Sequence, residues 1–92
     1  MKRIIFLPSA ELDIKESANF YYEVNVELKD RFVRELSDSF EHIRKNPSAF
    51  PKVKNEIRKC LMLDFPFCIY FVEKTESIFI LAVFHTKRNP KI

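Results

Sequence analysis

Apolar residues recur every three or four positions between Asn25 and Pro47, and charged residues fill most of the positions between them. This spacing gathers the apolar side chains on one face, which predicts an amphipathic helix that packs on a core. Pro47 and Pro51 follow and cannot continue the helix. The predicted apolar face consists of Leu28, Phe32, Leu36, Phe40 and Ile43.

The segment before this helix predicts another one, running from Ala10 to near Val24. Apolar residues again fall three or four apart there, and Ser9 is a candidate N-cap. Asn25 is placed to end the first helix and to cap the second. Because the connection is short, we expect the two helices to be antiparallel neighbours.

Four segments have the composition of strands, because they are short, apolar and bounded by turn residues. The predicted fold class is therefore α+β, with the order β-α-α-β-β-β and a helical hairpin packed on a small, mainly antiparallel sheet. We expect one domain over residues 1–92. The predicted strands are 2–7, 56–63, 67–72 and 78–84.

The sequence contains no glycine, which excludes several kinds of ligand site. Phosphate-binding loops and dinucleotide fingerprints need glycine where the backbone approaches phosphate, so we expect no nucleotide and no other cofactor. Cys60 and Cys68 are too few for a disulfide scaffold, and we expect them to be reduced. The His and Cys residues show no ligand spacing, so we expect no metal site.

Positive charge is concentrated in the second half of the chain. Residues 1–46 carry eight Lys/Arg and nine Asp/Glu, a net of −1, whereas residues 47–92 carry eight and four, a net of +4. Such asymmetry suggests an acidic partner or a polyanion, although a solubilising surface would produce the same pattern. No apolar run is long enough to cross a membrane or serve as a signal peptide, so we expect a cytoplasmic protein.

The last strand runs directly into a cluster of cations. His85 stands where this strand should leave the core, as a proton carrier, a phosphate ligand or simply a half-buried residue at the core edge. Lys87, Arg88 and Lys91 follow it. If the last three strands form a meander, we expect this cluster to adjoin a second one at the same sheet end, formed by Lys52, Lys54, Arg58 and Lys59. The alternative is two solvated charge runs without a ligand.

Several stretches together resemble toxins of the RelE/ParE superfamily from bacterial type II toxin–antitoxin systems. These are "PSAELDI", "FYYEVNVELKDRF", "NPSAFP", "IRKCLMLDFPFCIYF" and "ILAVFHTKRNP". The resemblance covers nearly the whole chain and implies the same β-α-α-β-β-β order. It also implies a cognate antitoxin as partner and a role of the kind linked to plasmid stabilisation.

The superfamily divides by activity, and this sequence departs from the nuclease branch at two places. RelE-like members cut mRNA on the ribosome, whereas ParE-like members are associated with inhibition of DNA gyrase and have no known catalysis. Cys68 stands where RelE-like members usually carry Arg, and no terminal Tyr follows His85. A nuclease needs an acid, a base and several phosphate donors at once. The resemblance therefore favours the ParE-like branch, without enzymatic activity.

Three functions remain open at this stage. The favoured one is a gyrase-inhibiting toxin that contacts its target through Arg58, His85, Lys87, Arg88 and Lys91. The first alternative is a ribosome-dependent mRNA endonuclease, whose partners would be the ribosome and mRNA. The second is a non-toxic member that only binds its antitoxin. Residues that would serve the nuclease are His85, Arg58, Arg88, Lys52 and Lys54.

Overall fold

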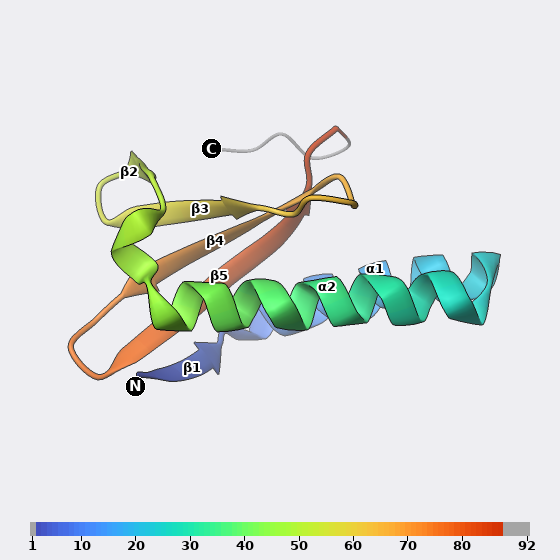
Figure 1. The fold of residues 1–92 in the computed structure, drawn as a ribbon, viewed down its shortest axis with the longest axis horizontal. Helices are drawn as coiled ribbons and strands as arrows, with labels where there is room; N and C mark the ends of the chain where they lie inside the picture. The colour runs from blue at the N-terminus through green and yellow to red at the C-terminus, as the bar shows by residue number, and fades with distance from the viewer. Residues whose placement is uncertain (1, 88–92) are drawn as a thin grey trace.

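The computed structural model describes residues 2–87, in which two helices pack against a five-stranded mixed sheet (Figure 1). The strand order is β1-β5-β4-β3-β2, with β1 parallel to β5 and every other neighbouring pair antiparallel. The elements are β1 (Arg3–Phe6), α1 (Pro8–Val24), α2 (Val26–Lys45), the 3-10 helix η1 (Pro47–Ala49), β2 (Lys52–Lys54), β3 (Ile57–Leu61), β4 (Phe67–Glu73) and β5 (Ser77–His85).

The predicted fold class and helical hairpin are confirmed. Asn25 ends α1 and also caps α2, where its side-chain oxygen accepts a hydrogen bond from the backbone N–H of Leu28 at 2.7 Å. The sequence did not predict β2 or η1, because three-residue elements carry too little periodicity to detect. The predicted N-cap Ser9 is wrong. Helix α1 begins at Pro8 with Leu7 as its N-cap, since proline suits the first helical position.

The core lies between the helices and one face of the sheet. Phe32 on α2 is fully buried, and its ring meets those of Tyr21, Phe65 and Phe67 at centroid distances of 5.0–5.3 Å. Leu36 continues this contact along the helix and is also buried. The aromatic turn around Phe65 is therefore part of the core.

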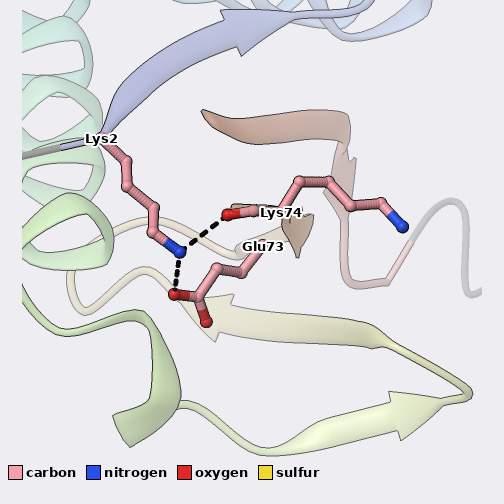
Figure 2. A network of polar contacts seen from close by, with 3 residues as sticks. All are labelled: Lys2, Glu73 and Lys74. Atoms are coloured by element: carbon pink, nitrogen blue, oxygen red, sulfur yellow. Dashed lines mark hydrogen bonds and ion pairs between the residues drawn. The ribbon is translucent and has the colours of Figure 1, made fainter. Parts of the chain in front are cut away.

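Lys2, just before β1, binds the end of the sheet at which β4 turns into β5. Figure 2 shows the Lys2 ammonium between the Glu73 carboxylate, at 2.5 Å, and the backbone carbonyl of Lys74, at 2.7 Å. These contacts join β1 to the β4–β5 turn, two segments far apart in sequence. Because the ion pair is partly exposed, it contributes at most about 1 kcal/mol.

Candidate functional site

The end of β5 is held by side chains of α1. Beyond Phe6 the strand β1 no longer pairs with β5, and α1 takes its place along this edge. The Ser9 hydroxyl donates to the carbonyl of Leu81 at 2.9 Å, and the Val83 N–H donates to the Asp13 carboxylate at 2.9 Å. These two contacts satisfy backbone groups that a neighbouring strand would otherwise bind.

His85 lies in a pocket between this edge and α1. Its register partner is Phe67, and the two rings meet edge to face at a centroid distance of 5.2 Å. The backbone N–H of Lys87 donates to His85 Nδ1 at 3.2 Å, and the Thr86 N–H donates to the Pro66 carbonyl at 2.7 Å. The pocket has a volume of about 400 Å³ and is lined by Asp13, Glu16, Ser17, Phe20, Phe67, Val83, Phe84 and His85.

The charge in this pocket opposes the phosphate-binding role considered for His85. Asp13 and Glu16 line it, and their carboxylates would repel a phosphate group. Lys87 is exposed in the turn just beyond the strand. A cationic side chain, and not a phosphate, would therefore find favourable electrostatics here.

The second predicted cluster is largely occupied with contacts inside the protein. The Arg58 guanidinium is half-buried and donates to the carbonyl oxygen of Phe50 at 2.6 Å. Lys52 forms an ion pair with Glu56 at 3.4 Å, and Lys54 is exposed on β2. Arg58 therefore fixes the segment that leads from η1 into β2.

The two predicted clusters do not meet, so the expectation of one combined basic site is wrong. The meander itself is present, but in it the start of β3 and the end of β5 lie at opposite ends of the sheet. Arg58 pairs with Phe71, which pairs with Ile80. His85 lies five residues further along β5, a separation of about 16 Å along the strand direction at about 3.3 Å per residue. Arg88 and Lys91 lie outside the described residues.

The sheet has a second face, turned away from the helices. Phe67, Ile69 and Phe71 point into the core, so Cys68 and Tyr70 point the other way. Cys68 is nearly fully buried there between its register partners on β3 and β5. This face is called the open face below. Its residues on β3, β4 and β5 are Ile57, Lys59, Leu61, Cys68, Tyr70, Val72, Phe79, Ala82 and Phe84.

The two cysteines lie on adjacent strands but on opposite faces of the sheet. Cys60 pairs with Ile69 and faces the core, whereas Cys68 pairs with Leu61 on the open face. Both thiols are free. Burial raises the pKa of the Cys60 thiol to about 11, with smaller increases from Cys68 and Glu35. Burial also raises the pKa of Cys68.

The sequence did not reveal a cleft between α2 and the end of β3. Glu35 reaches across it and accepts hydrogen bonds from the backbone N–H groups of Leu63, at 2.5 Å, and Asp64. Glu35 appeared in the sequence as one of many charged residues on the polar side of a helix. The cleft has a volume of about 520 Å³, and its lining includes Arg31, Arg34, Asp38, His42, Phe50, Leu61 and Phe65.

Metal and membrane sites find no support in the part of the chain that the structure describes. Within residues 2–87, no three His, Cys, Asp or Glu side chains are grouped so that they could hold a metal ion. None of the described helices is long and apolar enough to cross a membrane.

Comparisons with known proteins agree with the fold. The family model for "ParE toxin of type II toxin-antitoxin system, parDE" matches residues 4–90. A chain of the solved structure "Chromosomal ParDE TA system from P. aeruginosa" is similar, with a TM-score of 0.78 and 18% sequence identity. The alignment covers 92% of this chain and 96% of that one. Among curated proteins, no sequence matches significantly.

Proposed function

Since the chain belongs to the ParE toxin family of type II toxin–antitoxin systems, we propose that it inhibits DNA gyrase by binding it. A cognate antitoxin neutralises it by binding in turn. The contact with gyrase is made by the end of β5, with the exposed Lys87 and the basic residues that follow it. This mode of action requires no proton transfer and no cofactor.

One observation favours this mode over RNA cleavage: the candidate nuclease residues are dispersed. Cleavage of a phosphodiester needs an acid, a base and cations around one phosphate. Here Arg58 and His85 lie at opposite ends of the sheet, and Arg58 is engaged with the Phe50 carbonyl. On the open face, Cys68 provides a buried thiol where a nuclease of the superfamily would usually carry arginine.

The proposal is tested with purified protein in two parallel assays. We expect inhibition of DNA supercoiling by gyrase and no cleavage of mRNA on ribosomes. Cells that express the protein alone should stop replicating and form filaments while translation initially continues. Codon-phased mRNA cleavage that His85→Ala or Arg58→Ala abolishes would overturn the proposal. Growth without any arrest would instead favour a non-toxic member that only binds its antitoxin.

The contact surface is tested by comparing two exposed lysines. Lys87→Ala, at the end of β5, should weaken inhibition of gyrase, and removal of residues 86–92 or Arg88→Ala should weaken it further. Lys74→Ala, in the β4–β5 turn at the other end of the sheet, is the matched control and should not. His85→Ala should have a smaller effect than loss of the basic residues, because no proton is transferred. Equal losses for Lys87→Ala and Lys74→Ala would argue against this surface.

A further inference from the structure

The open face is largely apolar, and neither helix covers it. Both helices belong to the other face, where the core cluster lies, and they pack against each other, with α2 in front of α1 in Figure 1. Tyr70 and Phe84 are half-buried against each other on the open face, with ring centroids 5.2 Å apart. Leu61 lies beside them and leaves 57% of its surface exposed. Contiguous apolar surface of this kind commonly marks a protein interface.

A single cation, Lys59, lies within this apolar surface. It is the register partner of Tyr70 and is half-buried. No carboxylate within residues 2–87 forms an ion pair with it. A half-buried lysine without an ion-pair partner inside the protein would gain from a carboxylate supplied by a binding partner. The edges of the same face carry two further cations, Arg3 on β1 and Lys54 on β2, and both are exposed.

We propose that the open face is the docking surface for the antitoxin. The bound segment places apolar side chains over Leu61, Tyr70 and Phe84 and a carboxylate beside Lys59. This inference rests on the proposed function, in which an antitoxin binds the chain, and it adds where that partner binds and which chemistry it carries. The required segment is amphipathic and acidic, with its apolar and acidic side chains on one side.

Other occupants fit this surface less well. A second copy of the chain in a symmetric contact would place this basic face against the same basic face, with like charges opposed. Nucleic acid is held through many cations along its backbone, whereas the open face carries three within residues 2–87, which are Arg3, Lys54 and Lys59. The chain's own residues 88–92 carry Arg88 and Lys91, which have the wrong sign to pair with Lys59.

The exposed apolar residues near the turn between the helices are a weaker candidate. Tyr22, Val24 and Val26 are each about half-exposed there. The nearby Lys29 is already paired with Asp30 at 3.3 Å, and Lys15, which lies beside Tyr22, is exposed to solvent. Neither is a half-buried charge like Lys59. The open face combines an apolar surface with an unpaired charge, which defines its partner more closely.

The test uses the protein encoded by the reading frame adjacent to this gene, co-expressed and purified with the full chain. Binding is then measured by calorimetry for matched variants. Leu61→Asp should weaken binding at least about tenfold, as expected for an anchor residue, whereas Leu12→Asp on α1 should change it less than about twofold. These leucines are comparably exposed, at 57% and 55%, so both variants should fold. Circular dichroism and thermal melting check that they do.

A second pair of variants tests the charge. Lys59→Glu should weaken binding at least about tenfold, because it places like charges together, whereas Lys74→Glu should leave binding within about twofold. Unchanged binding by both Leu61→Asp and Lys59→Glu would overturn the docking proposal while leaving the antitoxin in place. No complex with the unaltered chain would overturn the antitoxin part of the proposed function itself.

The same variants identify the other occupants. If the free chain forms a dimer in sedimentation that Leu61→Asp dissolves, a second copy occupies the face and the proposal is wrong. Binding of single-stranded RNA that Lys59→Glu abolishes would assign the face to nucleic acid and would also overturn it. A variant without residues 88–92 tests the third alternative. If this variant binds the antitoxin more tightly and Leu61→Asp no longer weakens that binding, residues 88–92 cover the face in the full chain.

Discussion

The guanidinium of Arg58 donates a hydrogen bond to the backbone carbonyl of Phe50, with Nη1 and O only 2.6 Å apart. Arg58 belongs to β3, whereas Phe50 follows the 3-10 helix η1, so the bond joins two successive segments. Arg58 also faces the helix side of the sheet, beside the buried Phe71. Arg58 is therefore placed to stabilise the fold and not to contact a target.

Arg58→Ala should lower the free energy of unfolding by about 1–2 kcal/mol, because the Phe50 carbonyl loses a charged donor in a partly exposed setting. Arg58→Lys should recover only part of this, since lysine lacks the planar fork of arginine. Urea denaturation measures both, and Lys54→Ala on the neighbouring strand is the control. Full stability of Arg58→Ala combined with lost gyrase inhibition would show instead that Arg58 contacts the target.

Phe32→Ala should be among the most destabilising single substitutions, at about 3–5 kcal/mol, because it leaves a cavity where three aromatic rings meet. Phe40→Ala should cost less, since Phe40 is only half-buried against Phe6. Val33→Ala on the exposed side of the same helix should stay within about 0.5 kcal/mol. A loss below about 1 kcal/mol at both phenylalanines would contradict the assignment of the buried face.

Local features of the fold were readable from the sequence, but contacts between distant segments were not. The periodicity that contains Phe32 and the double capping by Asn25 act over a few residues, and both were predicted correctly. The meander of the last three strands was also considered from the sequence, yet the conclusion that Arg58 and His85 share a sheet end was wrong. In an up-down-up meander the first and third strands start at the same end of the sheet. The start of the first strand and the end of the third therefore lie at opposite ends.

The surroundings of the candidate site depend on residues that no local pattern connects. Asp13 on α1 lines the pocket of His85 although the two are far apart in sequence, and this makes the pocket acidic. The identity of the open face depends on whether Cys68 or Ile69 points to the helices, which the apolar run "FCIYFV" does not reveal because both faces are apolar. The register with β3 and β5 decides it.

Stability should decrease as the pH rises from 9 to about 11, in part because of Cys60. Burial raises the pKa of this thiol from 9.0 to about 11, so the unfolded chain loses the proton first. The stability that the protonated Cys60 thiol contributes is therefore complete below pH 9, and it is lost as the pH rises through the folded-state pKa. Because Cys68 and Tyr70 also have raised pKa values, Cys60→Ala should make the decline shallower without removing it.

Urea denaturation of the unaltered chain and of Cys60→Ala at about pH 8 and about pH 10.5 provides the comparison. The difference in stability between the two proteins should shrink or change sign at the higher pH. Slow alkylation of Cys60 near neutral pH is a second expected result, because the reactive thiolate is scarce. Parallel pH dependences for the two proteins would mean that Cys60 does not contribute.

Glu35 should control the loop between β3 and β4. Its carboxylate accepts hydrogen bonds from the N–H groups of Leu63 and Asp64, and these bonds hold the loop against α2 together with the packing of Phe65 on Phe32. Glu35→Ala removes both acceptors, so the free energy of unfolding should fall by about 1–2 kcal/mol. Glu35→Gln keeps one amide oxygen as an acceptor, so the free energy of unfolding should fall by less. What this variant loses is the negative charge that strengthens the two hydrogen bonds.

Hydrogen exchange makes this prediction specific to the loop. The amides of Leu63 and Asp64 should exchange faster in Glu35→Ala, by a larger factor than the amide of Ile69 in the centre of β4, because local opening no longer breaks the two bonds. Glu41→Ala, further along α2 in an ion pair with Arg44, is the control and should leave both loop amides unchanged. If all three amides accelerated by the same factor in Glu35→Ala, the effect would be global unfolding, and the proposed role of Glu35 in holding the loop would be wrong.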